Sequence, residues 1–591
     1  MTLTVILRIE SACKLTMSIE RMNQLKNSQG KFGFANALGI SLKQLTRAVY
    51  GIPVQNRYST FLIPKSTGGH RVIHVPHREI KFVQKALANL LQICLSEIET
   101  KKGVVRPVSH GFHPGRSIFS NAWAHRNKNY VMNFDLENFF HSIHFGRICS
   151  FFEKNNDFLL HPKVANLIAN LSCHRIDGGG TFLPQGSPCS PIISNFIAMP
   201  LDQKLRKLAR DNGCRYSRYA DDITFSTNKD LFPDDIAIFD VSSKKWIAGS
   251  GILKVISKSG FKLNIQKTNM SIAGTRQIVT GLVVNKQVSV SRPVYKWARA
   301  AADHMFKDGV AFKRDPSTAS IHTTDRQVTL GHIIGQVNHI CYARRKSNIP
   351  LLNSRKMVGP ELLYRRLTYY ERFFAHKETL IICEGETDNT YLKIAIDKLG
   401  HKFKNVARRA DGNPQVKLLN VTPHITIYTA LNGGSDQQKS FLQNYDNDMS
   451  IVGERWADKC VIIFGDNDSG ANSIMQILRG KSIIPGDIKT ADFTYYTRNL
   501  YVILTPIPNK NSISMIEDFL DPNASRVKLE NKVFHLGGKG FDEKKHYGKK
   551  ALSEHVRQNA SKYDFSKFEI ILKRIDLAID DYSSRLAALK L

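Results

Sequence analysis

The stretch Arg215-Tyr216-Ser217-Arg218-Tyr219-Ala220-Asp221-Asp222-Ile223-Thr224-Phe225-Ser226 is the part of this chain that decides its fold. Two short β-favouring runs flank the four residues from Tyr219 to Asp222, a pattern that predicts a strand, a tight turn and a returning strand. The turn presents two adjacent carboxylates, and carboxylate oxygens are ligands that suit Mg²⁺. Adjacent aspartates also occur in many solvated turns, so the pair alone is weak evidence for a metal site.

A third carboxylate stands at the end of another β-favouring run. The segment from Tyr130 ends in Asp135, and a segment of helical character is expected after it. An aspartate at a strand end can join the aspartate pair of a neighbouring hairpin. Three carboxylates can then hold two metal ions about 4 Å apart for in-line attack on a phosphate. The alternative for Asp135 is an N-cap at the start of a helix.

Further segments complete an ordered set of motifs. The Pro-rich run from Leu183 to Pro191 leads into an apolar helical start. Together with the aspartates, this run resembles motifs A, B and C of reverse transcriptases. Two more segments, Phe61–Pro76 and Gly260–Thr268, look like the fingers motif and motif D of the same enzymes.

Two short signatures narrow the resemblance to retron reverse transcriptases. Asn121-Ala122-Trp123-Ala124-His125 matches their NAxxH signature, and Val279-Thr280-Gly281 matches their VTG signature. The resemblance covers about residues 30–370. It implies a right-hand polymerase with fingers, palm and helical thumb, which makes DNA from a cognate noncoding RNA that serves as template and primer. It further implies a branched RNA–DNA product and a role in antiphage defence.

The resemblance assigns roles to particular residues. Mg²⁺ would be held by Asp135, Asp221 and Asp222. Lys65 and Arg71 would bind the triphosphate of the dNTP, and Gln185 and Gly186 would let the nascent base pair approach the backbone closely. Phe140, five residues after Asp135, would exclude nucleotides that carry a ribose 2′-hydroxyl. The candidate RNA-binding residues are Asn121, His125, Val279, Thr280, Gly281, Arg344, Arg345 and Lys346.

The charge of the chain indicates a polyanionic partner. Its 591 residues include 84 Lys and Arg against 51 Asp and Glu, a net charge of +33. Such an excess repels itself unless a polyanion neutralises it, so nucleic acid is the expected partner. A basic membrane-surface protein is an alternative, but no long basic amphipathic helix stands out and no apolar run approaches a membrane span, so no membrane contact is expected.

Length and cysteine usage set further expectations. A chain of this length is too long for one core, so two or more domains are expected. The nine cysteines form no C-x-x-C pair, which argues against a zinc ribbon and favours reduced thiols in the cytoplasm. The apolar run Leu3–Leu7 is short and soon charged, unlike a signal peptide, and Met17 is an alternative start. A homo-oligomer is compatible with the sequence.

A basic segment follows the predicted polymerase core. From Arg344 to Lys377 there are nine Lys and Arg and two acids. Positive charge can track phosphates while aromatic rings stack unpaired bases. The alternative is an amphipathic linker helix with a solvated face. The interleaved aromatic residues are Tyr364, Tyr369, Tyr370, Phe373 and Phe374.

A second acidic constellation follows two apolar runs. Thr379–Cys383 precedes Glu384-Gly385, and Cys460–Phe464 precedes Gly465-Asp466-Asn467-Asp468. Continuous apolar runs are typical of buried parallel strands. Acidic residues at the carboxyl ends of such strands lie at the crevice where ligands bind, so Glu384, Asp466 and Asp468 could share one Mg²⁺. A single acidic loop of this kind is more often a solvated turn or an N-cap.

The ordered pair of loops resembles a Toprim domain, and Gly433-Gly434-Ser435 is similar to the small-residue loop between its acidic sites. Glu517 resembles the extra acidic position of the OLD-nuclease branch. The resemblance implies a Mg²⁺-dependent nuclease with a nucleic-acid target, fused to the polymerase as an effector. Asp388 and Lys549 are further candidate nuclease residues.

The predicted architecture is a multidomain α+β and α/β protein, in which a right-hand polymerase precedes a Toprim Rossmann-like α/β domain. Two alternatives stay open: a group II intron-like reverse transcriptase, and a nucleic-acid-binding protein with an inactive Toprim. The predicted segments are a helical lead-in (1–45), fingers and palm (46–285), thumb and basic connector (286–377), the Toprim domain (378–530) and a C-terminal extension (531–591).

Overall fold

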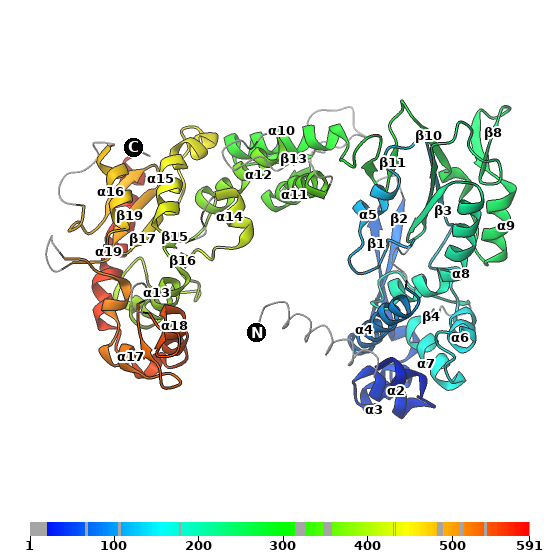
Figure 1. The fold of residues 1–591 in the computed structure, drawn as a ribbon, viewed down its shortest axis with the longest axis horizontal. Helices are drawn as coiled ribbons and strands as arrows, with labels where there is room; N and C mark the ends of the chain where they lie inside the picture. Colours follow the sequence, from blue (N-terminus) through cyan, green and yellow to red (C-terminus); the bar gives the residue numbers. More distant parts are fainter. Residues whose placement is uncertain are drawn as a thin grey trace. The chain divides into compact units, whose positions relative to one another are not determined.

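The computed structural model forms two compact units, Met1–Ser291 and Arg292–Leu591 (Figure 1). The boundary falls close to the predicted end of the palm at residue 285. The structure describes residues 21–65, 69–103, 108–175, 179–313, 326–346, 357, 359–429, 431, 433–480, 488–507, 512–536 and 541–589.

The first unit is built on a four-stranded antiparallel sheet with the strand order β10-β3-β7-β6. The predicted hairpin is confirmed, because β6 and β7 pair on either side of the turn. The apolar residues of β3 and β7 are fully buried, which fixes the register of the two strands. The strands are β3 (Tyr130–Asp135), β6 (Arg215–Tyr219), β7 (Asp222–Thr227) and β10 (Asn269–Ile272).

Helices and short hairpins complete the first unit. The helices include α2 (Lys31–Leu38), α3 (Leu42–Tyr50), α4 (Arg78–Lys101), α5 (Ile118–Ala124), α6 (Phe145–Lys154), α7 (Pro162–Ser172), α8 (Ser190–Asp211) and α9 (Ser250–Lys258). The two-stranded sheets are β1 (Tyr58–Pro64) with β2 (His70–Pro76), β4 (His174–Arg175) with β5 (Thr181–Phe182), β8 (Ala237–Asp240) with β9 (Lys245–Ala248), and β11 (Ile278–Val279) with β12 (Leu282–Val283).

One local prediction in this unit is wrong. The residues after β3 form turns, and the next helix, α6, begins only at Phe145. Asn138 has a φ of +48°, a left-handed conformation that interrupts a helix. Asp135 is therefore not an N-cap, since no helix starts there.

The second unit contains a five-stranded sheet with the order β16-β15-β17-β19-β18, in which only β18 is antiparallel. All residues of β15, β17 and β19 are buried, as their apolar runs predict. The strands are β15 (Thr379–Cys383), β16 (Val416–Leu418), β17 (Val461–Gly465), β18 (Thr494–Thr497) and β19 (Leu500–Leu504). The first of these matches its predicted run, and β17 begins one residue later than predicted.

The remaining elements of this unit are mostly helical. They include α10 (Arg292–Asp308), α11 (Leu330–Lys346), α12 (Pro360–Tyr369), η4 (Tyr370–Phe374), α13 (Glu386–Leu399), α14 (Pro423–Thr429), α15 (Ser435–Met449), α16 (Ala471–Gly480), η7 (Ile516–Phe519), α17 (Pro522–Arg526), α18 (Lys549–Gln558) and α19 (Glu569–Ala588), with the pairs β13 (Ala311–Lys313) and β14 (Arg326–Val328), and β20 (Val533–Phe534) and β21 (His546–Tyr547). Across the described ranges, no helix is both long and apolar enough to cross a bilayer.

The helices before the sheet share its core. The rings of Tyr369 and Phe373, in α12 and η4, pack against Phe441 in α15, with centroids 6.0 and 5.0 Å apart. All five aromatic residues of the predicted basic connector are buried. The expectation that they stack unpaired bases is therefore wrong in this structure, because these rings are already used to join the helices to the sheet.

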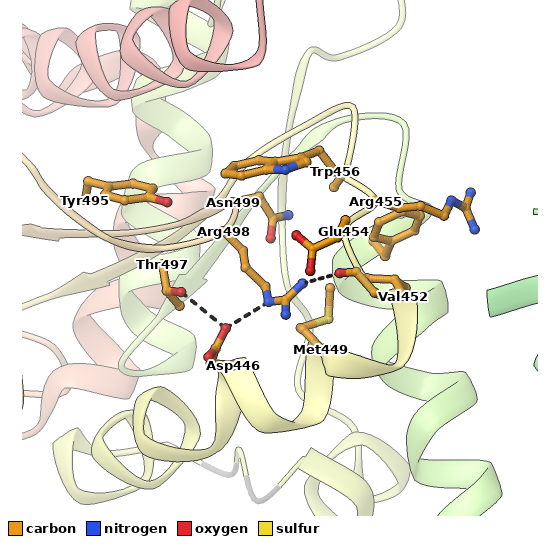
Figure 2. A pocket seen from close by; sticks show the side chains of 13 residues that line it. Asp446, Met449, Val452, Glu454, Arg455, Trp456, Tyr495, Thr497, Arg498 and Asn499 are labelled. Carbon is orange, nitrogen blue, oxygen red and sulfur yellow. Dashed lines mark hydrogen bonds and ion pairs between the residues drawn. The ribbon is translucent and has the colours of Figure 1, made fainter. Parts of the chain in front are cut away.

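A cavity of about 250 Å³ lies at the amino-terminal ends of the parallel strands (Figure 2). Its charged groups are largely engaged with the protein: Asp446 accepts from Arg498 Nε at 2.8 Å, and Arg498 Nη1 donates to the carbonyl oxygen of Gly453. Arg455 reaches the carbonyl oxygens of Met305 and Phe306 in the last turns of α10. These contacts hold the β18–β19 turn and tie α10 to the sheet.

Candidate functional site

The three predicted carboxylates of the first unit meet at one edge of its sheet. Asp135 is the direct partner of Asp222 in the β3–β7 register, and Leu136 N donates to the carbonyl oxygen of Asp221 at 3.0 Å. Two of them, Asp135 and Asp221, line a cavity of about 930 Å³. Its lining includes the candidate residues Lys65, Arg71, Asp135, Phe140, Gln185 and Asp221, and also Asn264 and Lys267.

The carboxylates influence one another. Burial and the neighbouring charges of Asp221 and Asp135 raise the pKa of Asp222 to about 7. Burial raises the pKa of Asp221 as well, and the charge of Asp135 adds to the effect. Three acids are thus close enough to oppose each other's ionisation.

Lys267 partly neutralises this cluster. Its Nζ lies 2.9 Å from Oδ1 of Asp135, and Asn264 Nδ2 donates to Oδ2 of the same carboxylate at 3.3 Å. The sequence interpretation placed Lys267 in the motif D segment without making it a site residue. Its position in that segment was the only sequence signal for a role at the site. The contact with Asp135 could not be read from the sequence, because the two residues are 132 positions apart.

The donor chemistry of this cluster fits Mg²⁺. Carboxylate oxygens are its usual protein ligands, and a divalent cation would relieve the mutual repulsion that raises the pKa of Asp222. Within the described residues, however, no three His, Cys, Asp or Glu side chains are arranged to hold a metal ion as they stand. The ammonium of Lys267 already uses one oxygen of Asp135, so a metal ion would compete with it there.

A buried ion pair supports the turn that carries the aspartates. Arg218 is fully buried, and its Nε and Nη2 donate to Asp202 on α8, both at 2.8 Å. Its Nη1 donates to the carbonyl oxygen of Ala220 at 2.9 Å. Ala220 has a φ of +56°, which is unfavourable for a residue with a Cβ. The ion pair therefore holds a strained residue directly before Asp221, and no sequence pattern indicates it.

The Gln185-Gly186 loop lies directly against β2. The amide of His74 donates to the carbonyl oxygen of Gln185 at 2.7 Å. Gly186 has a φ of +122°, and a Cβ there would lie 2.5 Å from the carbonyl oxygen of His74. Only glycine fits this close approach to β2, and the predicted role of the loop at the substrate stays a prediction.

Phe140 borders the same cavity and is half-buried. Its ring packs edge-on against Phe139 and Phe112, with centroids 5.4 and 6.1 Å away. These neighbours limit its movement, as a ring that excludes a 2′-hydroxyl requires. Lys65 and Arg71 are exposed on the cavity wall, on the β1–β2 hairpin.

Asn121 and His125 of the NAxxH signature belong to an internal network, which corrects their assignment to RNA. His125 and Asn121 are fully buried. His125 hydrogen-bonds Ser226 and Ser217, each at 2.7 Å, and Ser217 donates to Asn121 at 2.6 Å. Burial lowers the pKa of His125 to about 3, so its ring is neutral. These side chains fasten α5 to β6 and β7 and do not reach the surface.

The VTG signature forms the turn between β11 and β12. Val279 is buried, which also excludes it from RNA contact here. Thr280 and Gly281 have φ values of +46° and +80°, as a tight hairpin turn requires. The Thr280 hydroxyl donates to the carbonyl oxygen of Ile118 at the start of α5, so both signatures meet at this helix.

The basic residues at the end of α11 also have internal contacts. Arg344 Nε lies 2.9 Å from Glu361 of α12, and the guanidinium of Arg345 lies over the ring of Tyr428 at 5.5 Å. Both arginines are half-buried. These contacts compete with the predicted binding of RNA phosphates. The side chain of Lys346 lies outside the described residues.

In the second unit, the predicted acids gather at the carboxyl ends of β15 and β17. Burial and the charges of Asp388 and Asp468 raise the pKa of Glu384. Burial, followed by the charge of Asp388, raises the pKa of Asp466 to about 7. The amide of Gly434 donates to the carbonyl oxygen of Glu384 at 3.0 Å, so the predicted small-residue loop lies beside them.

Lys549 and Glu517 complete this acidic cluster. Lys549 Nζ lies 3.0 Å from Oε2 of Glu517 and 4.0 Å from Oδ2 of Asp466. The side chain of Glu517 is 4% exposed, and its Oε1 is buried without a hydrogen-bond partner among the described residues. A buried carboxylate oxygen without a partner is costly, so this donor set fits a cation ligand. In the part of the chain that the structure describes, no three His, Cys, Asp or Glu side chains are already placed to hold a metal ion here.

Comparisons with known proteins identify a family for the part of the chain that contains the first site. The family model for reverse transcriptases (RNA-dependent DNA polymerases) matches residues 63–290. The retron Mx162 reverse transcriptase of Myxococcus xanthus is 32% identical over 336 residues, which cover 52% of this chain and 66% of that protein. This chain thus spans slightly less than two thirds of that relative's length.

A second relative is covered more fully. The retron Ec86 reverse transcriptase of Escherichia coli is 30% identical over 277 residues, 46% of this chain and 77% of that protein. Among solved structures, telomerase from Candida albicans with a fragment of telomeric RNA is a remote likeness, at 14% identity and a TM-score of 0.27 over 54% of this chain and 62% of that chain. The family model and the Ec86 match establish that the chain belongs to the retron reverse transcriptases.

Proposed function

We propose that this protein is an RNA-directed DNA polymerase whose active site is the cavity lined by Asp135 and Asp221, with Asp222 beside them. The observation that carries the proposal is the register pair of Asp135 and Asp222, of which Asp135 lines that cavity. Lys65 and Arg71 on its wall supply positive charge for a triphosphate, Arg71 through a planar donor fork.

The side chains at this cavity have proposed roles in the reaction. Bound Mg²⁺ would supply Lewis-acid chemistry, which activates the attacking hydroxyl and stabilises the leaving pyrophosphate. Asp135, Asp221 and Asp222 would hold it, while Lys65 and Arg71 orient the dNTP. Gln185 and Gly186 let the nascent base pair lie against the backbone. Phe140 would clash with a ribose 2′-hydroxyl.

We extend the proposal to the family's product. A cognate noncoding RNA would serve as template and primer, with a guanosine 2′-hydroxyl starting synthesis, so that the product is a branched RNA–DNA molecule. The net charge of +33 supports a polyanionic partner of this kind. The proposed role is antiphage defence in the cytoplasm.

The test is the double variant Asp221→Asn with Asp222→Asn. It removes two carboxylate charges while keeping side-chain shape, so extension of a primed RNA template should fall to background while RNA affinity is largely kept. The matched control is Asp211→Asn with Asp230→Asn, two exposed aspartates outside the cavity. Normal extension by the first double variant would refute the site.

A second activity is proposed for the acidic cluster of the second unit. The unpartnered Oε1 of Glu517, whose Oε2 lies 3.0 Å from Nζ of Lys549, favours a cation-dependent site there. We propose that Glu384, Asp388, Asp466, Asp468 and Glu517 serve a Toprim-like, Mg²⁺-dependent nuclease. Lys549 would balance the charge of a bound phosphate. The RNA–DNA product would restrain this effector until a phage disturbs it.

Separate variants test this second proposal. Glu384→Ala or Asp466→Ala should abolish nuclease toxicity and phage protection while branched DNA is still made. Asp411→Ala, an exposed aspartate of the same unit, is the control. A Glu384→Ala strain that makes normal branched DNA and still protects fully would show that this cluster is not the effector.

A further inference from the structure

A basic hollow lies on the first unit, outside the two acidic sites. It is bounded by α6, α8 and α9 and has a volume of about 580 Å³. Its lining includes four lysine and arginine side chains and, among the lining residues that the structure describes, no carboxylate. The four cations of the basic hollow are Arg147, Lys154, Lys204 and Lys258.

Arg147 forms a fixed part of the hollow. Its guanidinium donates to the carbonyl oxygens of Ser259 and Gly260 at 2.6 and 2.9 Å. It also lies over the ring of Phe261 at 4.0 Å. These contacts join α6 to the end of α9 and leave the positive charge of Arg147 without a carboxylate partner in the described lining.

The three lysines are exposed. The one side-chain contact recorded for them in the described residues joins Lys204 Nζ to Ser259 Oγ at 3.4 Å. A hydroxyl does not neutralise an ammonium, so the charges in the hollow repel one another. Water and salt screen these exposed charges only in part, and a bound anion would offset them further.

Helix dipoles explain part of this arrangement. Lys154 and Lys258 stand in the last turns of α6 and α9, where a cation is favourable beside the helix carbonyls. Lys204 stands in the interior of α8, so the dipole of that helix does not account for its charge at the same hollow.

The hollow is distinct from the polymerase cavity. The two share no lining residue. They are connected through Arg147, Phe261 and Phe139: Phe261 stacks on Phe139 with centroids 5.6 Å apart, and Phe139 lines the polymerase cavity. A polyanion in the basic hollow would therefore leave the dNTP cavity open.

We propose that the basic hollow binds the phosphodiester backbone of RNA at a second, non-catalytic site. Ammonium groups contact phosphates as point charges, which suits attachment without base recognition. Such a site would hold a folded RNA on the body of the enzyme while its end enters the polymerase cavity. The identification of the polyanion as RNA rests on the proposed RNA-directed synthesis. The excess of positive charge in the hollow is independent of that proposal.

The test compares two triple variants of the full-length protein. One is Lys154→Gln with Lys204→Gln and Lys258→Gln. The control, Lys43→Gln with Lys81→Gln and Lys85→Gln, removes the same charge from exposed positions of α3 and α4 outside the hollow. The probe is a fluorescent RNA hairpin of defined sequence, titrated by anisotropy at several KCl concentrations.

The hollow variant should bind the hairpin at least about tenfold more weakly, and its log Kd–log salt slope should fall by about one unit for each phosphate that is no longer neutralised. The control should keep a slope close to wild type. An unchanged slope in the hollow variant would overturn the proposal and would point to an acidic protein partner instead. If the triple variant misfolds, Lys204→Gln and Lys258→Gln are tested singly for about one unit each.

Extension of a short, unstructured primer–template separates this proposal from the proposed polymerase. At saturating concentrations the hollow variant should extend it at the wild-type rate. A wild-type enzyme that fails to extend it would refute the polymerase, and hairpin binding would still report on the hollow. A hollow variant with normal hairpin binding but reduced extension would overturn the second site.

Discussion

Nη1 of Arg218 lies 2.9 Å from the carbonyl oxygen of Ala220, the residue directly before Asp221. The same guanidinium makes two hydrogen bonds to Asp202. The turn that carries Asp221 and Asp222 is thus fastened to α8 by a buried arginine. The position of the aspartates depends on a side chain that does not line the cavity.

Arg218→Lys should slow DNA synthesis more than it weakens dNTP binding. Lysine keeps the charge but lacks the planar fork, so it cannot hold Asp202 and Ala220 together. A displacement of the turn by about 1 Å can cost as much as a hundredfold in rate. We expect kcat to fall at least about tenfold with a similar KM, measured by steady-state extension.

The control for Arg218 is Arg206→Lys, on the exposed face of α8. Active-site titration corrects for any unfolded fraction, because breaking a buried ion pair also destabilises the fold by about 3–5 kcal/mol. An unchanged kcat per active molecule of Arg218→Lys would contradict the positioning role.

Phe140→Ala should admit ribonucleotides. The substitution removes the ring at the cavity wall, and it takes from Phe139 and Phe112 only an edge-on neighbour. The ratio of dNTP to rNTP incorporation efficiency should fall by at least about tenfold, or about 1.4 kcal/mol of discrimination. Phe82→Ala is the control, since this exposed ring of α4 does not line the cavity. An unchanged ratio would place the selecting group elsewhere.

His125→Ala should destabilise the protein without a specific loss of RNA binding. It leaves Ser217 and Ser226 without their imidazole partner inside the core, at a cost of about 2–4 kcal/mol in the free energy of unfolding. Urea denaturation measures this cost. A variant of normal stability with weak RNA binding would mean that the NAxxH signature contacts RNA after all.

Asp222 should make metal-free stability depend on pH. Its raised pKa of about 7 means that the folded protein keeps a proton that the unfolded chain has released above the usual aspartate pKa of about 4. The folded state binds more protons in that window, so the free energy of unfolding should fall as pH rises from about 4 to about 7. Urea titrations in metal-free buffer measure the slope.

Asp466 has a similarly raised pKa, so the contributions need separation. Asp222→Asn and Asp466→Asn should each remove part of the slope, and the double variant more than either. A slope that both single variants leave unchanged would show that neither carboxyl is protonated in the folded protein near neutral pH.

The strands and the carboxylates could be predicted because the evidence for them is local. The β6–β7 hairpin, β3 and the two apolar strands of the second unit each have their pattern within a few residues. The role of the NAxxH signature could not be predicted, since the partners of His125 lie 92 and 101 residues away. The same holds for Lys267, and for the aromatic residues of α12, whose partners belong to α15.

The aromatic contacts of Tyr369 and Phe373 with Phe441 bear on how this chain could gain or lose its C-terminal half. A cut after residue 377 would strip these rings of their cover and expose a large apolar surface on the preceding helices. The helices α12 and η4 therefore cannot be separated from the rest of the second unit without this cost. An ancestor without the sheet would have needed a different set of side chains on these helices, and a shortened protein made for the laboratory would need the same redesign.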